Sequence, residues 1–140
     1  MANETIVSIG SYTEIISSAA VANGVMSAAS TSIATALSAT EEVYPLLDFK
    51  LDITSGTAPT LNATFDLYRR PADGTDSSSI PTTTYLQQYV GSFVVANAND
   101  QYYIYGAANT DPNDTYYVLN NGGQTSTFTL DVRAKSYGTA

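Results

Sequence analysis

Two stretches of the chain alternate apolar and polar residues with a period of two. In the first, within 46–54, the apolar positions are Leu47, Phe49, Leu51 and Ile53. In the second, near the C-terminus, they are Phe128, Leu130, Val132 and Ala134. Successive side chains of a strand point to opposite faces, so this pattern predicts two strands, each with one face in a core and the other outside.

The sequence between these stretches predicts further short strands separated by turns. Residues 61–67 alternate in the same way, and residues 101–105 and 116–119 are rich in residue types that favour strands. Residues 83–95 predict one long strand or two, bent at Gly91. Roughly eight short strands at this spacing predict an all-β fold, an antiparallel β-sandwich or jelly roll.

The first 40 residues differ in composition from the rest. They are rich in Ala, Ser and Thr, and their only charged residues are Glu4 and Glu14. The β-branched content of Thr5–Ile9 and Tyr12–Ile16 predicts strands. We therefore expect one domain overall, in which residues 1–40 form an extended N-terminal arm with the first strands and residues 41–140 form the sandwich body.

Two local signals within the first 40 residues suggest more detail. Asn23 and Gly24 predict a tight hairpin that joins residues 20–22 to residues 25–27. Residues 28–39 are compatible with a strand or with an Ala-rich helix. Their Ser, Thr and Ile content lowers helix propensity, so we favour a strand.

Composition and charge narrow the function. Only 13% of the 140 residues are charged, against about 25% in a typical soluble domain. The outward faces of the strands are instead rich in Ser, Thr, Asn and Tyr, which suits contact with another surface. The net charge is −8 with only five Lys and Arg residues, which argues against nucleic acid and against an anionic membrane as partners.

Groups for catalysis or metal binding are scarce. The chain has no His and no Cys, so it lacks the common general base, the thiolate nucleophile and the usual zinc ligands. Oxygen ligands for calcium could come from Asp100, Asp111 and Asp114, or from Asp73 with Asp76. Asp is a preferred turn residue, so solvated turn acids are the favoured interpretation. We expect no enzyme activity, no cofactor and no metal site.

The eleven tyrosines are the remaining chemical feature. If Ile104 belongs to the core, Tyr103 and Tyr105 point outward. Exposed tyrosines are enriched at protein interfaces and also stack on sugars, although cross-strand pairs in an ordinary sheet are an equal alternative. Strand parity gives six candidate contact residues, which are Ile6, Ile9, Tyr12, Ile15, Tyr103 and Tyr105.

The order of segments from Tyr44 to Tyr137 is similar to that of a known family. The segments are YPLLDFKLDI (Tyr44–Ile53), DLYRRPADGT (Asp66–Thr75), YVGSFV (Tyr89–Val94), YYVLNNGGQ (Tyr116–Gln124) and TFTLDVRAKSY (Thr127–Tyr137). This layout resembles the capsid decoration, or cement, proteins of tailed bacteriophages, which are of jelly-roll type.

The resemblance implies a structural role on the exterior of a virion capsid. Such a protein binds the assembled shell, bridges neighbouring copies of the major capsid protein and stabilises the shell, as a symmetric dimer or trimer whose arms reach across capsomer boundaries. Two alternatives stay open. One is a carbohydrate-binding module that stacks a surface glycan on the exposed tyrosines, and the other is a tail or adaptor component of the same virion.

Overall fold

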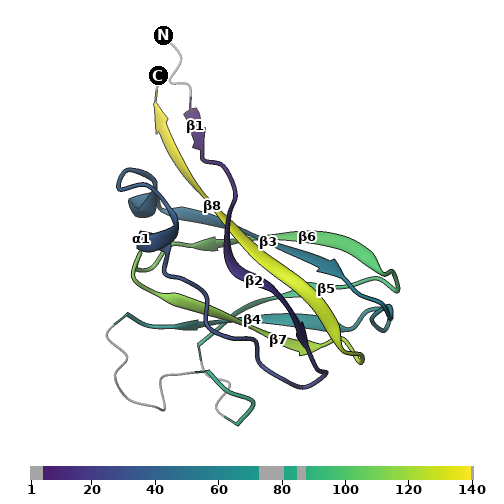
Figure 1. The fold of residues 1–140 in the computed structure, drawn as a ribbon. Helices are drawn as coiled ribbons and strands as arrows, with labels where there is room; N and C mark the ends of the chain where they lie inside the picture. Colours follow the sequence, from purple (N-terminus) through teal and green to yellow (C-terminus); the bar gives the residue numbers. More distant parts are fainter. Residues whose placement is uncertain (1–4, 73–80, 85–87, 140) are drawn as a thin grey trace.

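The computed structural model describes residues 5–72, 81–84 and 88–139, which form two antiparallel sheets packed face to face (Figure 1). The strands are β1 (Thr5–Ile9), β2 (Thr13–Val21), β3 (Leu46–Thr54), β4 (Thr64–Arg70), β5 (Tyr89–Val94), β6 (Asp100–Ala108), β7 (Thr115–Asn121) and β8 (Ser126–Thr139). Two short helices, α1 (Ile33–Ala36) and the 3-10 helix η1 (Glu41–Val43), lie between β2 and β3. The predicted all-β sandwich is therefore confirmed.

The larger sheet, sheet A, has five strands. Its order is β1-β8-β3-β6, and β2 pairs with β8 as well. Because β8 is 14 residues long, it has room for both β1 and β2 along its length. The smaller sheet, sheet B, has three strands in the order β5-β4-β7.

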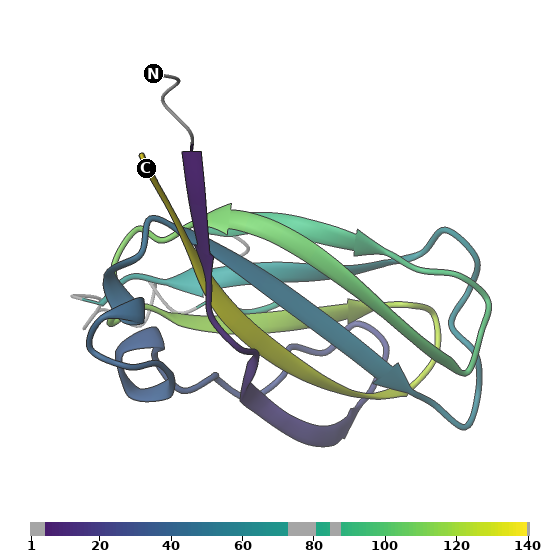
Figure 2. The same cartoon turned by 90° about the horizontal axis from the view of Figure 1, so that it is seen from above.

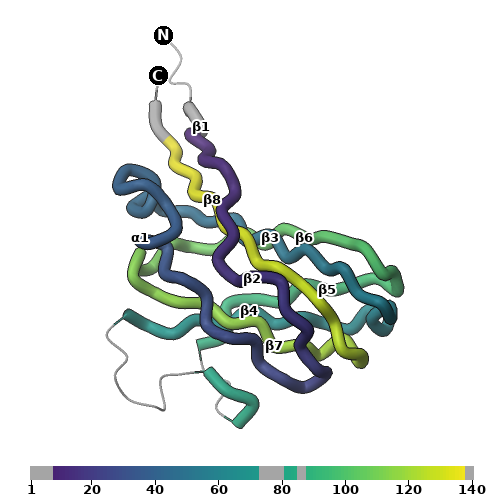
Figure 3. The backbone as a smooth tube through the Cα atoms, viewed as in Figure 1, coloured from purple at the N-terminus to yellow at the C-terminus, as the bar shows by residue number. Residues whose placement is uncertain are grey.

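A non-helical segment, residues 24–30, takes the place of a fourth strand in sheet B, and we call it the strap. It runs along the outer edge of β7. There the side-chain hydroxyls of Ser27 and Ser30 accept hydrogen bonds that the backbone carbonyls of a regular neighbouring strand would accept. The Ser27 hydroxyl accepts the amide of Val118 at 3.0 Å, and that of Ser30 accepts the amide of Tyr116 at 2.9 Å. Figure 3 shows the chain turning after β2 and running past β7 towards α1.

With the strap counted as a strand, the pairing is nested from the ends of the chain inward. β2 pairs with β8, the strap with β7, β3 with β6, and β4 with β5. One long hairpin rolled into two layers has this arrangement, which is the jelly roll. The fold is therefore held together by contacts between segments that are distant in sequence.

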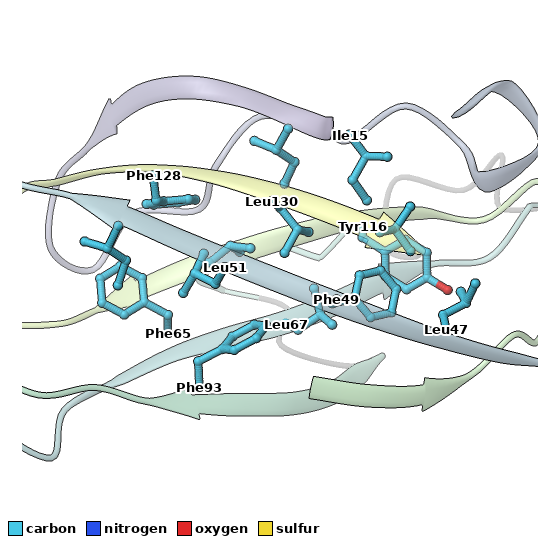
Figure 4. Close-up of a cluster of buried hydrophobic side chains, with 14 of the residues drawn as sticks. Ile15, Leu47, Phe49, Leu51, Phe65, Leu67, Phe93, Tyr116, Phe128 and Leu130 are labelled. Atoms are coloured by element: carbon cyan, nitrogen blue, oxygen red, sulfur yellow. The ribbon is translucent and has the colours of Figure 1, made fainter. Parts of the chain in front are cut away.

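The core lies between the two sheets (Figure 4). The alternation predicted within 46–54 and 128–134 is confirmed, since all eight apolar positions are buried. Aromatic rings from the two sheets meet in this layer. The rings of Phe49 and Tyr116 lie 4.6 Å apart, and those of Phe65 and Phe128 lie 5.6 Å apart. Burial of these side chains supplies most of the driving force for folding.

Three local predictions are wrong. Asn23 and Gly24 do form a tight turn, with φ 78° at Gly24 and with the Val25 amide donating to the Ala22 carbonyl at 3.1 Å. The predicted strand pairing does not continue beyond this turn, because the chain crosses to sheet B, where Met26 bridges Leu119. Residues 28–39 contain no strand. They contain α1 followed by its C-cap residue Leu37, and Ile33 and Leu37 are both buried because residues four apart share one face of a helix.

The third error concerns residues 83–95, where the strand covers only Tyr89–Val94 and residues 85–87 lie outside the described part of the chain. Neither helix within the described residues has the length and apolar character that crossing a membrane requires.

Most of the first 40 residues belong to the sandwich body. β2 and α1 contribute Ile16, Val21 and Ile33 to the same core as the rest of the chain. Among the described residues of this region, β1 stands away from the body and pairs with the last residues of β8 (Figures 1 and 2).

Candidate interaction surface

The outer face of sheet A carries most of the cationic side chains of the protein. Because Leu47, Phe49 and Leu51 point into the core, their neighbours on β3 point outward. The strand register aligns these neighbours with outward residues of β6 and β8. We define the outer face by Tyr12, Asp48, Lys50, Asp52, Tyr102, Ile104, Thr129, Asp131, Arg133 and Lys135. It therefore holds three of the five Lys and Arg residues of the chain.

An ion cluster lies at the centre of the outer face. The register places Asp48 opposite Arg133. The Arg133 Nε donates to Asp48 Oδ2 at 2.9 Å, and the Lys135 Nζ lies 2.9 Å from Asp48 Oδ1. Asp48 is buried although it lies on the outward side of β3. Both of its oxygens are paired, as a buried carboxylate requires, and the cluster joins β3 to β8.

Tyr12 lies over this cluster and connects it to the neighbouring cations. The Arg133 guanidinium carbon is 4.6 Å from the centre of the Tyr12 ring, and the Lys50 Nζ is 5.6 Å from it. The Lys50 Nζ also lies 5.2 Å from the centre of the Tyr102 ring. Cations over aromatic rings are attracted by the ring quadrupole. The predicted contact residue Tyr12 therefore belongs to a row that runs from Arg133 to Tyr102.

The most exposed apolar side chains of the outer face are Tyr102 and Ile104 on β6. Tyr102 is 64% exposed and Ile104 is 50% exposed. Both flank Lys50, because Ile104 pairs with Lys50 and Tyr102 pairs with the next outward residue, Asp52. The two side chains form an exposed apolar pair with the charged residues Lys50 and Asp52 beside it.

The predicted outward position of Tyr103 and Tyr105 is wrong. Tyr103 pairs with Leu51 and Tyr105 with Phe49, so both share the inward face of β3 and pack against the core. The Tyr103 hydroxyl donates to Gln101 Oε1, and the Tyr105 hydroxyl donates to the Val90 carbonyl at 3.3 Å. The parity of β6 is the reverse of the one expected, because Ile104 is not a core residue.

The three remaining predicted contact residues are isoleucines of the first two strands. Ile9 is 54% exposed at the end of β1. Ile15 is only 4% exposed and lies in the core near Tyr116, as Figure 4 shows, so its prediction as a contact residue is corrected. A register shift in β2 turns both Ile15 and its neighbour inward. Ile6 lies in β1, where its backbone pairs with Gly138.

The acidic residues considered as calcium ligands do not gather. Asp100 begins β6, whereas Asp111 and Asp114 follow its end, roughly 26 Å away along the strand. Asp114 is buried and accepts hydrogen bonds from the Ala72 amide and the Thr110 hydroxyl, each at 2.8 Å. Within the described ranges, no three acidic, His or Cys side chains come together as a cation site, and Asp73 and Asp76 lie outside those ranges.

The surroundings of one carboxylate on the outer face, that of Asp131, disfavour its ionised form. Burial raises the pKa of Asp131 above its ordinary value of 3.8; Lys50 opposes this rise, and Glu14 and Asp52 add to it. The folded protein therefore keeps this proton to a higher pH than the unfolded chain, so stability falls as the pH rises past 3.8 and the loss remains at neutral pH.

We expect Asp131→Asn to stabilise the protein at pH 7. The gain should be only about 0.5 kcal/mol, because solvent screens this partly exposed group and because the like-charged pair with Glu14 is worth little more. Urea denaturation at pH 7 and at pH 3 measures the effect, which should vanish at pH 3, where Asp131 is protonated in both states. A loss of stability at pH 7 would show that the attraction between Asp131 and Lys50 outweighs the cost of burial.

Two sequence comparisons complete the description of the site. No model of a known protein family matches this chain. A search of curated proteins finds no significant similarity either. The function is therefore argued from the outer face and from the strands that border it.

Proposed function

We propose that this protein is a virion structural protein that decorates a phage capsid and bridges neighbouring subunits of the shell. The observation that carries the proposal is the exposed pair Tyr102 and Ile104 on the outer face of sheet A. Tyrosine is enriched at protein interfaces, and exposed apolar patches with polar borders mark docking sites. The resemblance of the segments between Tyr44 and Tyr137 to cement proteins supplies the partner, the major capsid protein.

The ion pairs and cation–π contacts that link the strands of the outer face support docking without rearrangement. Asp48 ties β3 to β8 through two ion pairs, and Tyr12 and Lys50 extend the contacts across the sheet. A surface that is already ordered loses little conformational entropy when it is covered. Each contact with the shell can therefore be modest. When several copies bind the shell at the same time, their modest individual affinities combine into stable attachment.

The carbohydrate-binding alternative has less support. It relied on Tyr103 and Tyr105 as a stacking platform, and both rings pack towards the core. Tyr102 alone offers one exposed ring on β6, and a second ring beside it on the outer face, Tyr12, is engaged by two cations. The geometry therefore favours a protein partner over a glycan.

The proposal predicts that acidic substitutions at the exposed pair abolish capsid attachment. The double variant Tyr102→Asp/Ile104→Asp should bind undecorated shells of the encoding phage at least about tenfold more weakly than the wild type, since two central contact side chains are lost. Co-sedimentation of purified protein with such shells measures the binding. Val94→Asp is the matched control, because Val94 is an exposed apolar residue of sheet B.

Unchanged binding of the double variant would exclude the outer face as the docking surface. The wild-type protein should also be present in stoichiometric amounts on intact particles. Its absence from them would overturn the proposed function itself.

A further inference from the structure

The two ends of the chain form a ribbon that stands away from the sandwich. We define the ribbon as β1 and residues Lys135–Thr139 of β8, which pair antiparallel over their full length. The pairing of β8 with β3 ends at Lys135, so beyond this point β8 has only β1 as a partner among the described strands. Figures 1 and 2 both show the ribbon projecting from the body.

Within the described part of the chain, the backbone of β1 has one side paired with β8 and one open side. The Gly10 amide donates to the Ala134 carbonyl at 2.9 Å, which marks this pair as hydrogen-bonded. Hydrogen-bonded pairs alternate with non-bonded pairs along an antiparallel ladder. Ser8 and Ile6 therefore direct their amide and carbonyl groups to β8, while the same groups of the other three residues point to the open side. These residues are Thr5, Val7 and Ile9.

The open side lacks the usual protection of an edge strand. Natural edges are blunted with charged residues, especially Lys, or with Pro, and β1 contains neither. A two-stranded ribbon alone is marginally stable in water. The ribbon also exposes two large side chains, Ile9 at 54% and Tyr137 at 52%. An added strand would satisfy the open amides and carbonyls.

The charge of the chain argues for a particular occupant. Each copy carries a net charge of −8, so two copies repel each other over most of their surfaces. β1 carries no charge at all, and residues 136–139 carry none either. The only charge of the ribbon is therefore the cation Lys135, so a second copy of the chain can approach along β1 with little repulsion.

We infer that β1 pairs antiparallel with β1 of a second copy of this chain, about a two-fold axis at Val7. In this register Val7 faces Val7 of the second copy, and Thr5 faces its Ile9. All three outward-facing residues thereby meet each other as hydrogen-bonded pairs. The same strand serves as donor and acceptor in both copies, as a two-fold interface requires. The result is a continuous sheet of order β8-β1-β1-β8 across two molecules.

This inference goes beyond the proposed function, because it concerns how copies of the chain recognise each other in the absence of a capsid. It also fits that function, since a dimer presents two outer faces to a shell. It is tested on the purified full-length protein alone. Failure to dimerise would leave the docking role of Tyr102 and Ile104 to be judged by its own experiment.

The first test is disulfide trapping with single cysteines, for which the chain is suited because it has no Cys of its own. In the inferred register the two copies of Val7→Cys have Cα atoms about 5.5 Å apart, within the range that a disulfide spans. The two copies of Ile9→Cys are about 14 Å apart, four residues along the strand, and serve as the matched control. Mild oxidation should yield covalent dimer from the first variant in large excess over the second. Equal yields would overturn the inferred register.

The second test removes one outward donor. Val7→Pro deletes an amide that points to the open side, and proline is tolerated on an edge whose N–H faces outward. Sedimentation velocity over a concentration series should show dimerisation weakened by at least about tenfold, whereas Val7→Ala, which keeps the amide, should dimerise like the wild type. Circular dichroism verifies that both variants are folded. A wild-type protein that is monomeric at every concentration, or trimeric, would overturn the two-fold pairing, as would a dimer that Val7→Pro leaves unchanged.

Discussion

Replacing Gly91 with Ala is expected to lower the free energy of unfolding by about 3 kcal/mol. Gly91 is a buried residue of β5, and the ring of Tyr105 on β6 occupies the space where a Cβ atom would lie. Tyr105 cannot easily move away, because its ring also packs against Phe93 with centres 6.2 Å apart. The added methyl group must therefore separate β5 from β6. Urea denaturation followed by circular dichroism measures the change.

Two further variants test this explanation. In a Tyr105→Ala background the ring is gone, so Gly91→Ala should then cost less than about 1 kcal/mol, which a double-mutant cycle reports as coupling between the two positions. Gly56→Ala is the matched control, because a Cβ at Gly56 meets no atom within 4 Å. A cost for Gly91→Ala that does not depend on Tyr105 would contradict the steric explanation.

The second large effect is expected at the ion cluster, where Arg133→Met should also lower the free energy of unfolding by about 3 kcal/mol. This substitution keeps an unbranched apolar stem but removes the guanidinium that pairs with Asp48 at 2.9 Å and stacks on Tyr12. Asp48 is left buried with Lys135 as its remaining partner. A buried carboxylate that loses a partner is more costly than the pair is stabilising, so the effect should be large. Urea denaturation at pH 7 measures it.

Lys50→Met is the matched control, because Lys50 contributes cation–π contacts on the same face but no ion pair to Asp48. It should cost less than about 1 kcal/mol. Replacing the whole cluster, with Asp48→Leu, Arg133→Met and Lys135→Met together, should recover most of the stability lost in Arg133→Met. If Arg133→Met costs no more than Lys50→Met, the cluster does not hold β3 to β8.

The strands of the core were predictable from local sequence. β3 and β8 each have one apolar face and one polar face. Only the apolar face can be buried in the core, so the alternation alone determines which side chains are buried. β6 does not have this property. Its sequence, DQYYIYGAA, places apolar residues on both faces, so a choice based on Ile104 was as consistent as a choice based on Tyr105. Neighbouring strands had to decide it.

The errors at the N-terminus have the same origin. Asn23 and Gly24 favour a turn but do not specify the strand that receives the chain after it. The exposed edge of β7 needs hydrogen-bond partners, and the strap supplies them with the hydroxyls of Ser27 and Ser30. Ile15 is buried because β2 contains a register shift. Both features depend on strands about 90 residues or more away in the sequence, so a local reading could not find them.

The sequence by itself determined the class of fold, the central strands and an exterior poor in charge, because these follow from the period of the pattern and from composition. Only the tertiary structure decided which face of β6 is exposed, how Asp48 is neutralised and that β1 pairs with the end of β8. Those outcomes depend on strand register, and a register is set by the packing of the whole sandwich. A shift of one residue exchanges the two faces of a strand, so the exposure of Tyr102 and Ile104 could be assigned only once β3 and β6 were aligned.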